Sequence, residues 1–425
     1  MKKLALLLMS LLMLSSLVGC SGSNTNDSET IKLTFWGHQN EPWNESYRQI
    51  GEKFTAENPG IEVSFEFFPY DQFESKVQTS LISKEGGADI YEMWGGWGVD
   101  FASTGALAVM PDAMAKDVID HVYPSTIGAL MYDGKLYGLP LEFNIENGGL
   151  LVNKTLLKDA NIPVPTTWAE LVSAGTKLTK EEGGILTQKG FDFVNWDSVP
   201  YMFLSMILST GGQYLDANGK FTLQTPEAKA ALQELYDMVV VDKVTDLEGL
   251  VGGGDLEGYQ QLYAGRNALV PRGPWVISEG TSSFGLTLGV DFDYVEMPWF
   301  GDKAAFAVET GWALSVNGSS KQQEAAYKFL EYFYQDENLL AHNVAAAQIP
   351  AKISVAQDPE LLNLMPFAKP LVKILGNAQF IGYFNTDQFK EAVNNTFVDL
   401  VMGTTPSVDE ALISLEEYLN TNVVK

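Results

Sequence analysis

The chain of 425 residues carries 54 acidic and 27 basic residues, which gives a formal net charge of −27. A surface this negative disfavours binding to nucleic acids and to anionic bilayers, because both require positive charge on the protein. The composition, with 46% hydrophobic and 19% charged residues, is that of a packed globular protein and excludes gross disorder. The length is ample for two domains.

The N-terminus has the pattern of a secretory signal peptide over residues 1–19. Two lysines precede an apolar run over 4–14, which is too short to span a membrane. The sequence around Cys20, the only cysteine, resembles a bacterial lipoprotein cleavage box. We therefore expect Cys20 to become the lipidated first residue and residues 20–30 to form a flexible tether. The alternative is an ordinary signal peptide that happens to contain a cysteine.

The first folded segment alternates strand and helix patterns. Alternation of apolar and polar residues predicts the strands, and apolar residues spaced along one helix face predict the helices between them. The expected order is a strand over 31–36, a helix around 47–54, a strand over 61–67, a helix over 71–83 and a strand near 89–93. This β-α-β-α-β order is typical of a parallel sheet with helices on its faces, so we predict an α/β fold.

The remainder of the chain also mixes helix and turn signals. A capping box at 167–170 predicts a helix through Leu178. Thr225 followed by a proline predicts the start of another helix, and the apolar spacing over 320–333 predicts a third. Two irregular segments are also expected, a hairpin turn over 216–219 and a glycine-rich mobile loop over 249–258.

A series of short motifs runs in order through the mature chain. The motifs are the strand ending at Phe35–Trp36, Asp133–Pro140 (DGKLYGLP), Leu151–Lys154 with Pro165–Leu171, Tyr263–Ala268 with Arg272–Trp275, and Gln348–Ala351. In this order the chain resembles the family 1 extracellular solute-binding proteins, the group that includes maltose-binding protein. The resemblance covers essentially all of the mature chain.

The resemblance implies a periplasmic-binding-protein type II fold, with two α/β lobes joined by a hinge and a ligand cleft between them. It implies lobe 1 over 28–143 plus 304–349 and lobe 2 over 144–303 plus 350–425. It also implies the extracytoplasmic binding component of an ABC importer, which closes on its ligand and presents it to a membrane permease. We expect a monomer that reaches the membrane only through its lipid, without cofactor, metal, nucleic-acid partner or enzymatic activity.

Aromatic residues in loop-like contexts point to a sugar as the ligand. A tryptophan ring can cover the apolar face of a sugar while carboxylates and amides bond its hydroxyls. Trp94 ends a predicted strand, where α/β sheets bind ligands, and the resemblance implies that Trp275 stacks on sugar. Trp43, Trp97 and Trp299 fit either the cleft or packing. The predicted ligand-binding residues are Trp36, His38, Glu41, Trp94, Glu142, Asn144, Trp196, Trp275, Glu309, Trp312, Tyr383 and Phe384.

Two alternative functions stay open. A chain with 54 acidic residues could hold the paired carboxylates of a secreted carbohydrate-active enzyme, although no Gly-x-Ser-x-Gly motif occurs and the three histidines lack metal-ligand spacing. The same fold could instead bind a non-sugar solute such as iron, a polyamine, a peptide or a phosphate ester. Arginine occurs only three times, which disfavours an anionic ligand, so we predict a neutral mono- or oligosaccharide.

Overall fold

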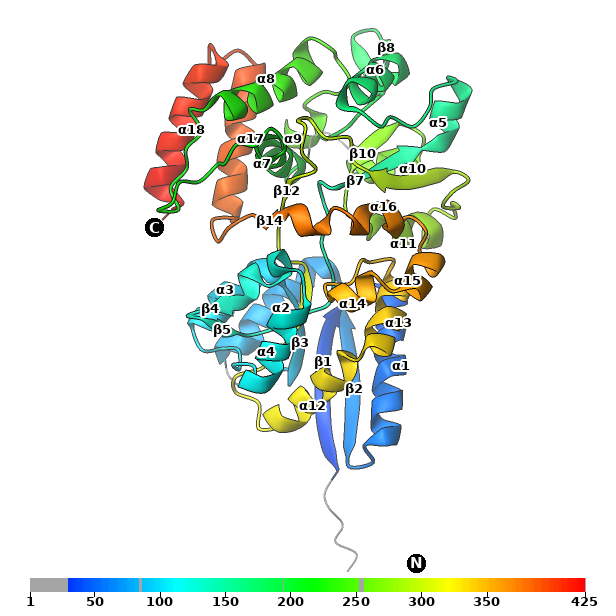
Figure 1. Ribbon diagram of the computed structural model, residues 1–425, viewed down its shortest axis with the longest axis vertical. Coiled ribbons are helices and arrows are strands. Elements are labelled where there is room, and N and C mark those ends of the chain that lie inside the picture. The colour runs from blue at the N-terminus through cyan, green and yellow to red at the C-terminus, as the bar shows by residue number, and fades with distance from the viewer. Residues whose placement is uncertain (1–29, 84–85, 194, 252–255, 425) are drawn as a thin grey trace, which may run out of the picture.

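A computed structural model describes residues 30–83, 86–193, 195–251 and 256–424. The predicted signal peptide, Cys20 and all but the last residue of the predicted tether lie outside these residues. The described chain forms two lobes stacked along the long axis of the molecule (Figure 1). The first strand lies in the lower lobe, and the C-terminal helices lie at the far end of the upper lobe.

Lobe 1, the lower lobe, is built on β1 Ile31–His38, β2 Ile61–Phe68, β3 Ile90–Trp94, β6 Leu139–Pro140 and β13 Trp312–Val316. These strands form one sheet in the order β2-β1-β3-β13-β6. β1 pairs in parallel with β2 and β3, which confirms the predicted parallel opening of the fold. β13 runs antiparallel to β3 and β6, so the sheet is completed by a segment from much later in the chain.

The helices of lobe 1 follow the apolar spacing of the sequence. They are α1 Glu41–Glu57, α2 Tyr70–Ser83, α3 Gly95–Ser103, α4 Asp112–His121, α12 Gln323–Phe333 and α13 Asp336–Ala346. Pro42 lies in the first turn of α1, where a missing N–H costs nothing. The buried face of α1, with Tyr47, Ile50 and Phe54, packs against β2 and α13. The shorter elements are η1 Pro124–Thr126, η2 Gly128–Leu130, β4 Met131–Tyr132 and β5 Lys135–Leu136.

Lobe 2 contains a three-stranded antiparallel sheet in the order β10-β7-β11, and helices surround it (Figure 1). Its strands are β7 Gly149–Asn153, β8 Lys180–Glu182, β9 Ile185–Gln188, β10 Leu269–Pro271 and β11 Phe292–Glu296, of which β8 and β9 form a separate hairpin. Its helices are α5 Lys154–Asp159, α6 Trp168–Leu178, α7 Ser198–Ser209, α8 Pro226–Val240, α9 Glu248–Val251, α10 Gly258–Tyr263, α11 Val276–Ser282, α17 Asp387–Val401 and α18 Val408–Asn422.

Local signals fix several of these elements. The capping box predicted at the start of α6 is confirmed, because the Thr167 hydroxyl accepts a bond from the Glu170 N–H and the Glu170 side chain bonds back. Thr225 caps α8 as predicted. The predicted turn over 216–219 is confirmed by a bond from the Gly219 N–H to the Asp216 carbonyl at 3.0 Å.

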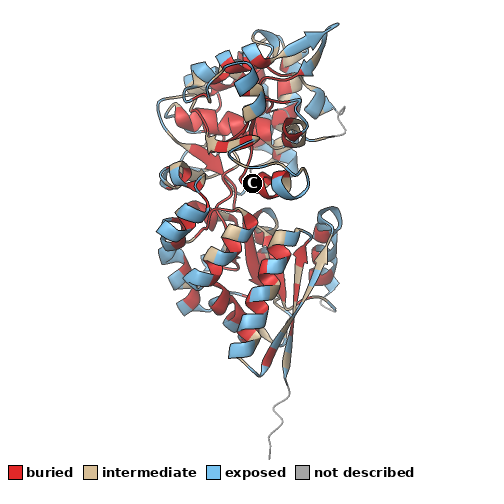
Figure 2. Ribbon diagram, turned by 90° about the vertical axis from the view of Figure 1, so that its right-hand side faces the viewer, coloured by how far each residue is buried: buried red, intermediate tan, exposed pale blue. Residues whose placement is uncertain are grey.

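The chain crosses between the lobes around 141–148, again between β12 Phe306–Val308 and β13, and finally on the way to β14 Ala378–Phe380. β12 pairs in parallel with β14. Buried residues continue through the narrow middle of the molecule, where Phe143 and Ile145 belong to the same core as lobe 1 (Figure 2). The crossings are therefore packed, which restricts how the lobes can move against each other.

The segment between β13 and β14 packs on both lobes. α14 Ile353–Ala356 and α15 Pro359–Leu364 contact α13, whereas α16 Ala368–Val372 contacts β11; η3 Leu375–Asn377 follows. The predicted boundary at residue 350 assigns α14 and α15 to lobe 2, although both helices contact α13 of lobe 1. The exact division of the chain between the lobes stays a prediction.

The glycine-rich segment over 249–258 is a partial exception to the sequence prediction. Residues 248–251 form the short helix α9 and Gly258 begins α10, so these ends are helical rather than loop. Residues 252–255 lie outside the described part of the chain. Within the described residues, no helix has the length and apolar character needed to cross a membrane.

Candidate functional site

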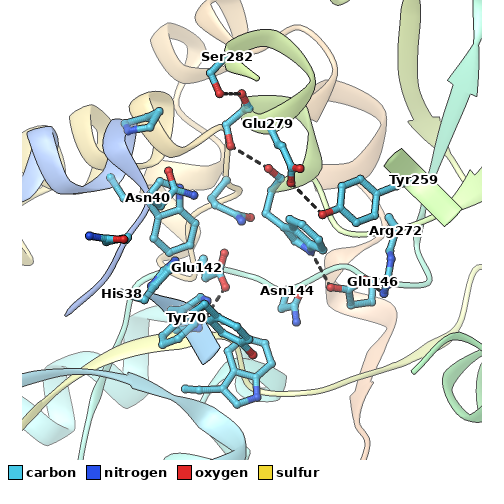
Figure 3. Close-up of a pocket in the computed structure, with 18 of the residues that line it drawn as sticks. His38, Asn40, Tyr70, Glu142, Asn144, Glu146, Tyr259, Arg272, Glu279 and Ser282 are labelled. Atoms are coloured by element: carbon cyan, nitrogen blue, oxygen red, sulfur yellow. Dashed lines mark hydrogen bonds and ion pairs between the residues drawn. The ribbon is translucent and has the colours of Figure 1, made fainter. Parts of the chain in front are cut away.

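A cavity of about 660 Å³ lies between the two lobes (Figure 3). Its lobe 1 wall comes from the carboxyl ends of β1 and β3 and from the first residues of α1 and α2. Its lobe 2 wall comes from α10, α11 and the loop before α11, and the crossing segment over 142–146 closes it between the lobes. The volume falls within the range of cavities that bind small molecules.

Trp312 is the centre of an aromatic wall on lobe 1. Its ring lies nearly parallel to the His38 ring, with a centroid distance of 4.5 Å and an angle of 16°. Trp94 and Tyr70 meet the same indole edge-on, at 5.2 and 6.3 Å. Trp312 is buried and Tyr70 is exposed, so the wall has a fixed base and an accessible rim.

Behind this wall, Glu92 holds the end of β1 in position. Glu92 lies on β3 and is fully buried. One of its oxygens accepts from the backbone N–H and from ring Nδ1 of His38, both at 2.9 Å, and the other accepts from the Tyr47 hydroxyl at 3.0 Å. Burial, followed by the charge of Glu92, raises the pKa of Tyr47 well above its usual value, so this hydroxyl remains a donor.

On lobe 2, a hydrogen bond from the indole N–H holds the Trp275 ring in place. Its Nε1–H donates to Glu146 at 2.8 Å, and the same carboxylate accepts from the Gly273 N–H at 3.0 Å. The Tyr259 ring meets the indole edge-on at 5.0 Å, and the Tyr259 hydroxyl donates to Glu279 at 2.8 Å. The half-buried Trp275 therefore borders the cavity in a fixed orientation.

The charge of the cavity wall is strongly acidic. Among the described residues that line it, Arg272 is the only lysine or arginine. Its guanidinium donates to Glu257 at 3.0 Å and lies 3.7 Å from Glu146, so its charge is already paired. Seven carboxylates line the same cavity, from Glu41, Glu142, Glu146, Asp197, Glu257, Glu279 and Glu309.

Glu142 is a buried acid in the first crossing segment. Its Oε1 accepts from the backbone N–H of Trp312 at 3.1 Å. Burial raises the pKa of Glu142 to about 8, and the neighbouring carboxylate of Glu146 acts in the same direction. Glu142 is therefore mostly protonated at neutral pH and can donate a hydrogen bond.

Glu309, which follows β12, links the crossing segments to lobe 2 through its carboxylate. It accepts from the Tyr201 hydroxyl at 2.7 Å, from Asn385 at 3.0 Å and from Asn144 at 3.4 Å. Burial raises the pKa of Glu309 to about 7, whereas the nearby Lys390 acts in the opposite direction. These contacts orient the Asn144 side chain on the wall of the cavity.

The structure brings eight of the twelve predicted ligand-binding residues to the cavity wall. They are His38, Glu41, Trp94, Glu142, Asn144, Trp275, Glu309 and Trp312. Trp43, for which the sequence left both roles open, also lines the cavity. Trp97 and Trp299 are not among the lining residues. Trp97 packs on Trp312 at 5.8 Å, and Trp299 stacks on Phe306 at 5.4 Å.

The structure does not bring Trp36 and Phe384 to the cavity. Trp36 lies on β1 among lobe 1 rings, edge-on to Phe68 at 5.1 Å and to Tyr91 at 5.9 Å. Phe384 is buried in the core of lobe 2, 4.8 Å from the Phe389 ring. Its neighbouring glycine and asparagine suggested a loop, but its ring is apolar and turns inward to be buried.

Trp196 and Tyr383 also lie outside the cavity wall. Trp196 is 46% exposed, and its carbonyl accepts from Asn394 at 2.9 Å. Tyr383 is 62% exposed and packs edge-on against Phe380 at 5.4 Å. Its hydroxyl reaches the carbonyl of Met131 in lobe 1 at 3.4 Å, so it bridges the lobes at a different point.

Sequence reasoning missed several residues of the wall. Glu146 could have been found, because it lies four residues after Glu142 in the same crossing segment. Tyr70, Tyr259, Glu279 and Gln348 give no comparable signal, since only the packing of the lobes brings them to one cavity. Among the described residues, no group of histidine, cysteine, aspartate and glutamate side chains could hold a metal ion.

Comparison with known proteins identifies the class that this fold and cavity define. The sequence profile of the bacterial extracellular solute-binding proteins matches residues 40–339, and the chain belongs to this family. Because the family acts outside the cytoplasm, the protein is extracytoplasmic.

Two curated relatives have related sequences. The arabinooligosaccharide-binding protein of Halalkalibacterium halodurans is 23% identical over 93% of this chain and 90% of its own length. The protein of the same description from Bacillus subtilis is 28% identical over 56% of this chain and 55% of its own.

Solved structures confirm the expected two-lobed fold. The GacH receptor of Streptomyces glaucescens, solved without ligand and with acarbose, has a TM-score of 0.73 at 24% identity, covering 93% of this chain and 98% of its own. A solute-binding protein of Thermotoga lettingae bound to α-D-tagatose has a TM-score of 0.74 at 22% identity, covering 93% of this chain and 100% of its own. At these identities the likeness shows the fold alone.

Proposed function

We propose that this protein binds a neutral mono- or oligosaccharide in the cavity between its lobes and delivers it to the permease of an ABC importer. The observation that carries the proposal is a cavity with aromatic rings on both lobes. Trp94 and Trp312 lie on one side and Trp275 on the other, with carboxylate and amide side chains between them. Such a surface matches a sugar, which has apolar faces and a rim of hydroxyls.

The acidic wall supports a ligand without negative charge. Among the described residues of the wall, an anionic sugar would meet six acidic side chains besides the protonated Glu142. It would meet one arginine, which is already paired with Glu146 and Glu257. Like charges in a partly buried site repel strongly, because the effective dielectric constant is low. Uronic acids and sugar phosphates should therefore bind poorly.

The relatives support the same ligand class. Two are described as binding arabinooligosaccharides, and two of the structural neighbours were solved with acarbose or α-D-tagatose. By analogy, the sugar would contact one lobe first and favour the closed state through contacts to the other.

The proposal extends to the attachment and assembly of the protein. Residues 1–19 would be removed, Cys20 would carry the lipid, and 20–30 would tether the lobes to the membrane. Lobe 1 would comprise about 28–143 plus 304–349, and lobe 2 the remainder of the mature chain. The folded part would act as a monomer.

Titration calorimetry tests the proposal directly. The wild-type protein is titrated with arabino-, malto- and manno-oligosaccharides, and in parallel with a polyamine, a peptide and a sugar phosphate. At least one neutral sugar should bind, and the sugar phosphate should not. Tight binding of a peptide or polyamine, together with no measurable binding of any neutral sugar, would reject the proposal.

An enzymatic assay tests the alternative. The proposal assigns no catalytic activity to the acidic residues of the cavity. Purified protein incubated with the oligosaccharide that it binds should release no reducing sugar over hours. Steady release that depends on Glu142 or Glu309 would show a carbohydrate-active enzyme instead.

A further inference from the structure

Three polar atoms in the lobe 1 wall of the cavity have no partner. Within the described residues, no hydrogen bond reaches Nε1 of Trp43, Oε2 of Glu142 or Oε1 of Gln348. All three side chains line the cavity, and the three residues are only 2–3% exposed. They come from α1, from the first crossing segment and from the residues just after α13, so three separate parts of the chain meet here.

An unpaired polar group is costly to bury. Leaving one buried donor or acceptor without a partner costs about 1–3 kcal/mol, and most such groups in folded proteins are paired. Three of them on one wall of a single cavity suggest that the partner comes from outside the chain. A molecule that enters the cavity and supplies the missing bonds would remove this cost.

The neighbouring residues hold the three atoms in place. The other oxygen of Glu142 is fixed by the backbone N–H of Trp312, and a side chain at Gly311 would come within 2.6 Å of that oxygen. Glu142 also pairs with Pro350 in an isolated antiparallel bridge, which draws the segment of Gln348 against the crossing segment.

Packing fixes the Trp43 ring as well. It meets the Trp312 ring edge-on at 6.4 Å and the His342 ring at 5.9 Å. Its Nε1–H therefore cannot turn away to find another acceptor without disturbing two buried rings. A wall of fixed, unpaired groups is preorganised for a ligand, because little ordering is needed on binding.

We propose that Trp43, Glu142 and Gln348 form a polar subsite of lobe 1, in which the sugar supplies the three missing hydrogen bonds. This inference rests on the proposed function and extends it to residues that fix which hydroxyls the site accepts. Trp43 donates to a sugar oxygen, and Gln348 accepts from a sugar hydroxyl.

The direction of the bond at Glu142 follows from its surroundings. Burial raises the pKa of Glu142 to about 8, the Trp312 N–H opposes this, and Glu146, Glu92 and Glu309 reinforce it. Oε1 already accepts a bond, so the proton belongs on Oε2, which then donates to the ligand. Other ionisable groups nearby are His38, stacked on Trp312, and Arg272, which lies beside Glu146. Tyr47 is a third, because the charge of Glu142 contributes to its raised pKa.

The subsite therefore offers two donors and one acceptor. A sugar has oxygens that accept and hydroxyls that donate, so it can satisfy all three groups. An ammonium group has no acceptor and would leave the Trp43 donor unpaired.

The test compares variants on whichever of arabinotriose, maltotriose and mannotriose the wild type binds most tightly. Gln348→Met and Trp43→Phe should each weaken binding about tenfold, as expected for stranding a buried hydrogen-bonding group of the ligand. Tyr334→Phe is the matched control, because its buried hydroxyl is also unpartnered but lies outside the cavity wall. Thermal unfolding without ligand identifies any variant that is misfolded. If Trp43→Phe is misfolded, the test rests on Gln348→Met alone.

The protonation of Glu142 is tested by comparing substitutions and pH. At pH 7 Glu142→Gln should bind about tenfold more tightly than Glu142→Leu, because only the amide can donate. Wild-type affinity should fall as the pH rises through about 8, by about tenfold in total, whereas that of Glu142→Gln should stay level over the same range.

The outcomes separate the two proposals. If the wild type binds no neutral sugar and instead binds a peptide or a polyamine tightly, both the proposed function and the subsite are rejected. If it binds a sugar but Gln348→Met and Trp43→Phe match the wild type, only the subsite is rejected. Equal weakening by Glu142→Gln and Glu142→Leu, with no pH dependence in the wild type, rejects the donor role of Glu142.

Discussion

The imidazole of His38 stacks on the indole of Trp312 at 4.5 Å, with the ring planes 16° apart. His38 ends β1 and Trp312 begins β13, so the stack joins the first strand of lobe 1 to the strand that returns from lobe 2. Glu92 holds the imidazole from behind at 2.9 Å. The aromatic wall is thus fixed to both the sheet and a crossing point.

Trp275→Ala should weaken sugar binding by about 1–3 kcal/mol, as for the loss of a stacked aromatic residue. The half-buried indole is held by Glu146 and borders the cavity, so its loss removes contact area from the cavity wall. Calorimetry measures the dissociation constant, and thermal unfolding checks the fold. Tyr418→Ala on α18, which removes a partly exposed ring far from the cavity, should bind as the wild type does. An unchanged dissociation constant for Trp275→Ala would remove Trp275 from the site.

Glu92→Ala should destabilise lobe 1 strongly. It leaves the His38 N–H, the His38 ring and the Tyr47 hydroxyl without an acceptor, at about 1–3 kcal/mol for each stranded group. Urea unfolding measures the loss. Glu62→Ala on the exposed face of β2 is the control and should change the free energy of unfolding by about 0.5 kcal/mol or less. Equal effects of the two substitutions would contradict the role given to Glu92.

Gly128→Ala should disturb the contact between η2 of lobe 1 and β14. A methyl group at Gly128 would collide with the Phe380 ring, so the substitution should cost about 1–3 kcal/mol of stability. Adding Phe380→Ala should recover part of this cost, with a coupling of about 0.5 kcal/mol or more in a double-mutant cycle. Strict additivity would mean that the two residues do not press on each other in solution.

The stability of the protein should fall as the pH rises from about 4.5 to about 8, in part because of Glu142. Burial raises the pKa of Glu142 from the ordinary 4.5 to about 8, so the folded state holds a proton that the unfolded state releases in this range. The contribution is complete below pH 4.5 and is lost towards pH 8. Urea unfolding of the wild type and of Glu142→Gln at five pH values isolates it. The wild type should lose stability relative to the variant across this window, and a constant difference would contradict the assignment.

Local signals in the sequence predicted the framework well. Alternation predicted β1 and β2 to within about two residues, because in both strands buried or half-buried residues alternate with more exposed ones. β3, predicted from its place after two glycines, is buried on both faces. Thr167 and Thr225 predicted helix starts, because a side chain that caps its own helix needs no distant partner.

The site was only partly predictable, because aromatic residues in similar sequence contexts lie in different places in the fold. Trp275 and Phe384 both lie beside glycine, proline or asparagine, yet one borders the cavity and the other is buried in the core. Tyr259 reaches the cavity through the packing of α10 against α11. Such placements depend on contacts between distant segments, which no local pattern records.

The most direct test of the account is native mass spectrometry of the protein purified from its host without denaturation. The account predicts a bound species that is released on activation, with a mass equal to that of a neutral mono- or oligosaccharide, and its loss in Trp275→Ala. A retained ligand with the mass of a peptide, a polyamine or a phosphorylated molecule would contradict it.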